Sequence, residues 1–301
     1  MKSLFVLIFS VLFSAYGSAL QTASPLSGSA KWATTVEGKY LIHPDVVYGS
    51  ANNYQLKLDV WQRKDVKEPV PTLIYYHGGG WIWGDRTGAT LFFLPYLEMG
   101  WNVVNVEYRM ASVSLAPAAV EDCRCALRWV VRNAKQYNID TNKIVLTGHS
   151  AGGHLSLISG MLPNETGLDN ECYGAEELKV AAIINWFGVT DVADLVSGPN
   201  WKNYALMWMG SQTDTLAIAK RVSPLSYVRR GGPQVLSIHG TADDVVPYEH
   251  AVRLHAALDK AGVPNELMTI QGGGHGQFTA EQLETSYVGI RAFLQKRGLI
   301  Q

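Results

Sequence analysis

The stretch KIVLTGHSAGG, residues 143–153, decides the fold of this chain of 301 residues. The apolar run 144–146 predicts a buried strand, and the apolar positions spaced along the next segment predict a helix. Between them, residues 148–152 form the pattern G-x-S-x-G around Ser150. In a strand–turn–helix setting this pattern indicates a nucleophile elbow, in which the serine takes a strained backbone conformation at the tip of a sharp turn.

A glycine-rich loop follows a second apolar run. Residues 72–76 predict a buried strand, and the sequence HGGGW comes directly after it. Consecutive glycines allow the backbone to fold so that its N–H groups point into a cavity. We predict that the backbone N–H groups of Gly79, Gly80 and Ala151 donate hydrogen bonds to an oxyanion that forms on the substrate. His77 is predicted to anchor the loop through a hydrogen bond.

Two adjacent carboxylates lie in the loop HGTADDVVP, residues 239–247. The loop follows a predicted strand, so in a parallel sheet it lies at the same edge as Ser150. Asp243 precedes a Val-Val-Pro turn that can support it, and we predict that Asp243 orients a histidine base. Asp244 is the alternative.

The base is predicted to be His275, in the sequence QGGGHG that follows the last predicted strand. The order Ser, Asp, His along the chain is the order typical of this type of elbow. Among the other histidines, His154 is expected to pack within the helix after the elbow. His250 and His255 lie on a predicted helix and are expected to be solvated.

The composition favours a globular protein with a large core. Hydrophobic residues make up 47% and charged residues 17% of the chain, and 25 basic residues face 26 acidic ones. A formal net charge of −1 does not favour a nucleic-acid partner, because nucleic acid usually requires a basic surface.

The N-terminus reads as a targeting segment. Residues 1–19 combine a positive start, a short apolar run and small residues before Ala19, which is typical of a secretory signal peptide cleaved after Ala19. We therefore expect a secreted or periplasmic protein with no stable membrane insertion after cleavage, with an uncleaved anchor as the alternative. Residues 20–44 are interpreted as a loosely held lead-in to a domain that spans 45–301.

The rest of the chain predicts strands that alternate with helices, which indicates an α/β fold with a mostly parallel sheet covered on both faces. An opening hairpin with a turn at Asn52-Asn53 suggests antiparallel strands at one edge. The long aromatic stretch 189–230 is interpreted as a small cap, or alternatively as a crossover with packed aromatics. The expected strands are 45–49, 55–61, 72–76, 101–108, 144–146, 180–187, 234–239 and 266–270, and the expected helices are 118–137, 248–261 and 280–296.

The three cysteines are too few and odd in number for a disulfide framework. Cys123 and Cys125 point to different faces of a predicted helix, and either of them could pair with Cys172. No histidine lies at ligand spacing beside them, so no metal site is predicted.

With these residues in place, the chain resembles the α/β-hydrolase superfamily. It looks closest to the hormone-sensitive-lipase-like esterases and to the bifunctional feruloyl and acetyl-xylan esterase-like group. The resemblance runs through residues 45–297 and is carried by the blocks HGGGW, EYR, GHSAGGH and HGTADDVVP. It implies an eight-stranded sheet, no cofactor, a structural role for Arg109, and Ser150, Asp243 and His275 as a catalytic triad. Gln277 departs from the family, which often has Phe or a small apolar residue there.

The sequence therefore predicts a serine carboxylic ester hydrolase that acts on short-chain acyl esters, with acetyl or feruloyl groups on plant polysaccharide as the candidate substrates. Trp81, Trp83 and Trp208 could stack on a sugar or an aryl group, or could simply wall the pocket. An arylformamidase that acts on N-formylkynurenine is the enzymatic alternative, since arylformamidases share the elbow sequence. A non-catalytic binding module of the same fold is the second alternative.

Overall fold

The computed structural model describes residues 25–51, 53–164, 166–170, 172 and 174–300. The predicted signal peptide and its cleavage point therefore lie outside the described residues. The chain divides into two units, 1–39 and 40–301. In the first unit, helix α2 (Gly28–Lys39) begins where the Ser27 hydroxyl accepts a hydrogen bond from the Ala30 N–H. None of its residues is buried, and the sequence indicated only a lead-in here.

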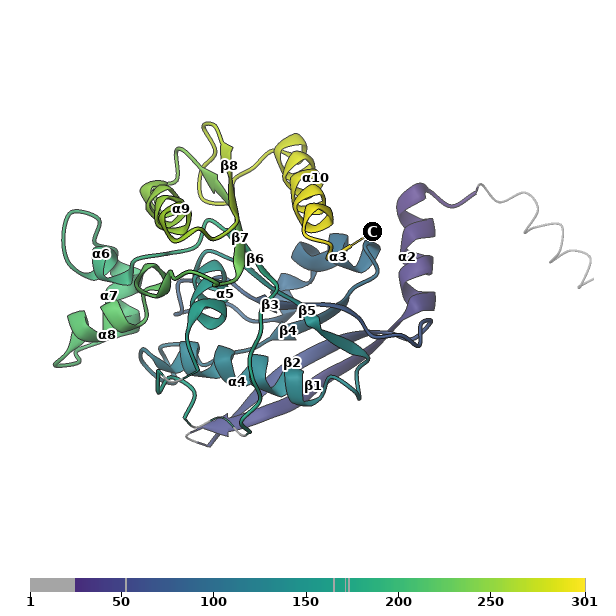
Figure 1. The fold of residues 1–301 in the computed structure, drawn as a ribbon, viewed down its shortest axis with the longest axis horizontal. Coiled ribbons are helices and arrows are strands. Elements are labelled where there is room, and N and C mark those ends of the chain that lie inside the picture. The colour runs from purple at the N-terminus through teal and green to yellow at the C-terminus, as the bar shows by residue number, and fades with distance from the viewer. Residues whose placement is uncertain (1–24, 52, 165, 171, 173, 301) are drawn as a thin grey trace, which may run out of the picture. The chain divides into compact units, whose positions relative to one another are not determined.

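The second unit is built on an eight-stranded sheet in the order β1-β2-β4-β3-β5-β6-β7-β8 (Figure 1). The pairs β1–β2 and β2–β4 are antiparallel, and all the other pairs are parallel. This confirms the predicted mostly parallel sheet with antiparallel strands at one edge. The strands are β1 (Tyr40–Ala51), β2 (Tyr54–Arg63), β3 (Val70–Tyr76), β4 (Asn102–Val106), β5 (Ile139–His149), β6 (Ala182–Trp186), β7 (Gln234–Gly240) and β8 (Asn265–Ile270).

The first strand is longer than the sequence predicted. It begins at Tyr40, whose buried hydroxyl lies 2.8 and 2.9 Å from the carbonyl oxygens of Leu97 and Trp101 and can donate its proton to either. The turn into β2 has a positive φ of 61° at Asn53, in agreement with the expected hairpin.

Helices flank the sheet (Figure 1). Helix α4 ends at Arg132, five residues before its predicted end, because the Asn133 side chain caps it by donating to the Trp129 carbonyl. Helix α3 was not predicted, since its sequence TLFFLPYLE is apolar almost all round and contains Pro95. These helices are α3 (Thr90–Glu98), α4 (Ala118–Arg132), α5 (Ala151–Met161), α9 (Glu249–Ala261) and α10 (Ala280–Lys296).

Four short helical segments follow β6, within the stretch predicted as a cap. They are α6 (Val192–Val196), α7 (Asn203–Met209), α8 (Thr215–Arg221) and the 3-10 helix η2 (Pro224–Tyr227). Figure 1 shows α6, α7 and α8 grouped at one end of the sheet, at the left of the view and below α9.

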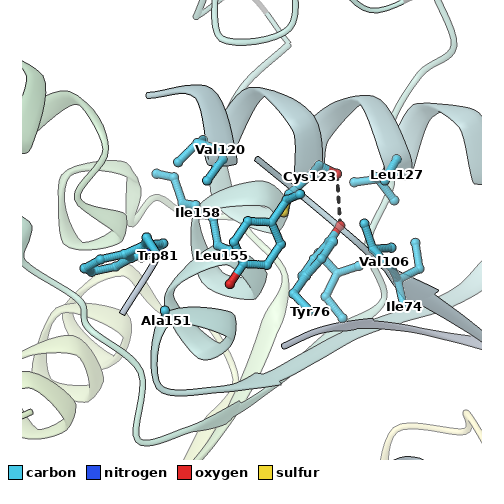
Figure 2. Packing of buried hydrophobic residues seen from close by; sticks show 14 of the residues in the cluster. Ile74, Tyr76, Trp81, Val106, Val120, Cys123, Leu127, Ala151, Leu155 and Ile158 are labelled. Atoms are coloured by element: carbon cyan, nitrogen blue, oxygen red, sulfur yellow. Dashed lines mark hydrogen bonds between the residues drawn. The ribbon is translucent and has the colours of Figure 1, made fainter. Parts of the chain in front are cut away.

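The core ties the glycine-rich loop to the elbow. Tyr76 at the end of β3, Ala151 and Leu155 on α5, and Cys123 on α4 belong to one buried cluster (Figure 2). The Tyr76 hydroxyl donates a hydrogen bond of 3.0 Å to the Cys123 carbonyl, which fixes β3 against α4. The strand before the loop and the helix after the serine therefore pack on the same interior.

Arg109 has the structural role that the resemblance implied. Its side chain is buried, and its guanidinium donates to both carboxylate oxygens of Asp122 in the first part of α4. A two-pronged ion pair of this kind needs a planar guanidinium and fixes the chain after β4.

A disulfide joins Cys125 on α4 to Cys172, across 47 residues of chain. Cys123 remains a free, buried thiol. The structure thus resolves the two pairings that the sequence left open: Cys123 faces the core, and Cys125 faces the segment that follows α5.

Replacing both Cys125 and Cys172 by Ser should destabilise the fold. Opening a loop of this length raises the entropy of the unfolded chain, which predicts a loss of about 4 kcal/mol in the free energy of unfolding. Urea unfolding with and without a reductant measures it. Reductant should lower the stability of the unsubstituted chain and leave that of the double variant unchanged. If the unsubstituted chain, denatured without reductant, showed three titratable thiols, the disulfide would be contradicted.

Candidate active site

Ser150 lies between the end of β5 and the first residue of α5. Its backbone has φ 56° and ψ −117°, a conformation that residues other than glycine rarely adopt. Gly152 permits this turn: a Cβ there would lie 1.9 Å from the Tyr76 carbonyl oxygen. The local structure is the strained strand–turn–helix that the pattern G-x-S-x-G predicted.

Three predicted residues come together at the carboxyl edge of the sheet. His275 Nε2 lies 2.8 Å from Ser150 Oγ, although 125 residues separate the two. On the other side of the ring, His275 Nδ1 lies 2.8 Å from Asp243 Oδ2. The serine hydroxyl, the imidazole and the carboxylate therefore form one hydrogen-bonded row.

The carboxylate of Asp243 is held by the turn that follows it. Its Oδ1 accepts hydrogen bonds from the backbone N–H groups of Val245 and Val246, at 2.9 and 2.8 Å. Burial alone would raise the pKa of Asp243, but hydrogen bonds from His239 and His275 outweigh it and hold that pKa below its usual value. Asp244 is exposed, and its side chain takes no part in the row.

The glycine-rich loop lies beside the serine. Gly79 has φ 123°, and a Cβ there would lie 1.8 Å from the Trp83 carbonyl oxygen, so only glycine fits. Among the described residues, none accepts a hydrogen bond from the backbone N–H of Gly79, Gly80 or Ala151. These are the three N–H groups that the sequence assigned to an oxyanion. Ala151 opens α5, where no carbonyl of the helix can reach its N–H.

His77 steadies this loop as expected. Its Nδ1 lies 2.8 Å from the Gly78 carbonyl oxygen, and its ring stacks on Tyr108 with centroids 4.4 Å apart. The Tyr108 hydroxyl in turn donates to the His77 carbonyl.

A cavity of about 1010 Å³ opens over Ser150 and His275. Its walls are mainly apolar and aromatic, which suits a ligand held by shape with a few polar contacts. The aromatic side chains that line it are Tyr75, Trp83, Phe92, Trp186, Phe187, Tyr204, Phe278 and Tyr287.

Two of the predicted substrate-binding tryptophans do not reach this cavity. Trp81 and Trp208 are fully buried and stack on each other, with ring centroids 4.1 Å apart. Trp81 also donates a hydrogen bond from Nε1 to His154 Nδ1. Both residues therefore belong to the buried core and not to the cavity wall. Of the three predicted tryptophans, Trp83 alone lines the cavity, with 69% of its surface exposed.

Several cavity residues were missed by the sequence reasoning. Trp186 and Phe187 stand at the end of β6, beside the elbow, and the strand-end position could have indicated them. Tyr204 comes from α7 in the predicted cap segment, and its hydroxyl donates to the Val245 carbonyl. Gln277, the departure from the family pattern, is exposed and does not line the cavity, whereas its neighbour Phe278 does.

The expectation that His250 and His255 are solvated is wrong. Both face inward from α9, with 0% and 6% of their surface exposed. His250 Nδ1 accepts a hydrogen bond from the Thr190 N–H, and burial lowers its pKa to about 4. Burial likewise lowers the pKa of His149 to about 3 and that of His154 to about 4. His154 packs within α5 as predicted.

His149, His154 and His250 should make stability depend on pH, and burial lowers the pKa of His255 in the same direction. Between about pH 6.5 and 4 the folded chain keeps them neutral, whereas the unfolded chain protonates them. The free energy of unfolding should therefore fall as the pH falls through this window. Calorimetry near pH 5, in buffers with different ionisation enthalpies, should show uptake of about three protons on unfolding. At pH 8 the uptake should vanish; a stability that is flat from pH 7 to 5 would contradict the buried, neutral histidines.

Known proteins are similar to this chain in sequence and in fold. The sequence profile of the BD-FAE family matches residues 58–258. The chain is 30% identical over 247 residues to esterase LipC of Mycobacterium tuberculosis, covering 79% of this chain and 60% of that protein. It is also 30% identical to esterase LipQ of the same organism, covering 72% and 53%. The chain thus spans about half to three fifths of the length of these relatives.

Solved structures share the fold over nearly their whole length. A truncated carbohydrate esterase from gut microbiota superposes with a TM-score of 0.75 at 26% identity, covering 86% of this chain and 96% of that one. The thermophilic esterase Est2 of Thermogutta terrifontis, with propionate bound, gives a TM-score of 0.72 at 26% identity, covering 85% and 94%.

Proposed function

We propose a serine ester-hydrolase function for this chain from one premise: the chain belongs to the BD-FAE family. The observation that carries the proposal is the row of 2.8 Å contacts from Ser150 Oγ through His275 to Asp243. A nucleophile within hydrogen-bond reach of a base, which is itself oriented by a carboxylate, is the arrangement that acyl transfer requires. The likeness to proteins named esterases supports the same reaction class.

In the proposed mechanism, His275 Nε2 takes the proton of Ser150 as the serine oxygen attacks the ester carbonyl carbon. The N–H groups of Gly79, Gly80 and Ala151 stabilise the oxyanion that forms. The imidazolium then gives its proton to the leaving alcohol, and an acyl-enzyme remains. Water attacks this ester in the second half, with His275 again as the base. Asp243 keeps the Nδ1 proton in place throughout, which leaves Nε2 free to accept.

For the substrate we propose an acyl ester on a carbohydrate, with an acetyl or a feruloyl acyl group. The aromatic lining of the cavity suits a planar acyl group, and its volume of about 1010 Å³ exceeds the needs of an acetyl group alone. The exposed Trp83 at the cavity could stack on a sugar ring. The likeness to a carbohydrate esterase supports a sugar on the alcohol side.

We also propose export to a secreted or periplasmic location. The signal-like residues 1–19 support it, and so does the disulfide between Cys125 and Cys172, because disulfides persist mainly in oxidising compartments. Within the described part of the chain, no helix is both long and apolar enough to cross a bilayer.

Ser150→Ala should abolish turnover. The variant keeps the fold but has no oxygen to attack the ester, so hydrolysis of p-nitrophenyl acetate should fall by at least about ten-thousandfold.

Release of acetate or ferulate from xylan, compared with hydrolysis of N-formylkynurenine, then identifies the substrate class. A native chain that is inactive on every ester would favour the binding module, and preference for the formamide would favour the arylformamidase.

Asp243→Asn should also lose activity, whereas the matched variant Asp244→Asn should not. The amide at position 243 can present an N–H to His275 and so favours the wrong imidazole tautomer, and a loss of about ten-thousandfold in kcat is expected. Asp244 is the adjacent exposed carboxylate and serves as the control. Equal losses in the two variants, measured as kcat on p-nitrophenyl acetate, would refute the role proposed for Asp243.

A further inference from the structure

His239 has no role in the mechanism so far, yet it lies directly behind Asp243, the carboxylate proposed to orient His275. It is on β7, one residue before the end of the strand, and its side chain is fully buried. Its Nε2 lies 3.3 Å from Asp243 Oδ2, the same oxygen that His275 contacts. Among the members of the row, His239 contacts Asp243 and not His275 or Ser150. Any effect of His239 on the reaction is therefore expected to pass through Asp243.

His239 also holds the backbone that supports Asp243. Its Nε2 lies 2.9 Å from the Val246 carbonyl oxygen. The N–H of the same residue, Val246, donates to Asp243 Oδ1 at 2.8 Å. One imidazole nitrogen therefore meets both the carboxylate and the turn that supplies backbone donors to it.

The position of the ring proton follows from its surroundings. The Nδ1 atom of His239 is buried and finds no hydrogen-bond partner among the described residues. Nε2 has two oxygen acceptors within reach, so the proton belongs on Nε2. Tyr248 packs edge-on against the ring, with centroids 5.7 Å apart, and keeps it in this orientation.

We propose that His239 is a positioning residue for the ester hydrolysis: its Nε2–H fixes the Asp243 carboxylate and the 245–246 turn in the geometry that orients His275. This inference rests on the proposed function, since Asp243 must act as the acid for its position to matter. This N–H contacts the Val246 carbonyl at 2.9 Å and faces the charged Asp243 carboxylate at 3.3 Å in a buried site, where polar contacts to a charge are strong, so its loss should be visible in turnover.

Two variants at the same position separate the hydrogen bond from the packing. His239→Gln can place a side-chain N–H where Nε2 stands, whereas His239→Leu fills a similar space without a donor. His239→Leu should lower kcat on p-nitrophenyl acetate about ten- to a hundredfold with little change in KM. His239→Gln should recover most of this loss. Assays well below the urea midpoint of each variant ensure that the folded protein is compared.

A double-variant cycle tests whether His239 acts through Asp243. In the Asp243→Asn background the carboxylate is gone, so adding His239→Leu should cost less than about threefold more in kcat. Losses that multiply in the double variant, or a Gln variant as slow as the Leu variant, would overturn the positioning role.

The same experiment distinguishes failure of this inference from failure of the proposed function. If the native chain does not hydrolyse the ester, or if Asp243→Asn is as active as the native chain, the proposed function fails. If the native chain is active and Asp243→Asn is slow, but His239→Leu keeps the native kcat, only the role of His239 is refuted.

Discussion

The close approach of α5 to the end of β3 is the constraint on which the site depends. The first turn of α5 comes so near the Tyr76 carbonyl that position 152 has no room for a side chain. Tyr76 is also the last residue before the glycine-rich loop. The same contact therefore brings the loop beside Ser150 and forces the serine into its strained conformation. The shared core beneath β3, α4 and α5 stabilises this approach (Figure 2).

The insertion after β6 supports the loop from below as well as contributing to the cavity. Trp81 leaves the loop with a positive φ of 62° and stacks on Trp208 of α7. It also donates to His154, whose Nε2 lies 2.8 Å from the Val222 carbonyl oxygen at the end of α8. Because these groups are buried and closely packed, a shift of α7 or α8 would displace the glycine-rich loop. The stretch 189–230 is thus both a set of packed aromatics and, through Tyr204, a wall of the cavity.

Sequence reasoning succeeded where a pattern reports directly on a backbone. Apolar runs located the strands, glycine spacing located the elbow, and the strand-end rule placed Ser150, Asp243 and His275 at one edge. It failed where the outcome depends on which side of a loop or helix meets the interior. Trp81 and Trp83 are two residues apart in one loop, yet only the structure shows that one is buried and the other exposed. His250 was expected to be solvated for the same reason, because the sequence did not show that it lies on the inward face of α9. Helix α3 was not predicted because a largely apolar segment that contains a proline shows no helical periodicity.

The histidine next to the serine shows why the neighbours of the proposed base matter. His149 is enclosed by aromatic rings, with Phe92 and Trp186 centroids 4.4 and 5.0 Å away, and its Nδ1 lies 3.0 Å from the Tyr75 hydroxyl. Burial keeps the pKa of His149 near 3, so this ring carries no charge at neutral pH. In the proposed mechanism, a cation there would repel the imidazolium that forms on His275 during attack. A polar but uncharged ring avoids that repulsion and is consistent with His275 as the proposed base. Two histidines at one site thus differ in chemistry because only one of them has a carboxylate partner.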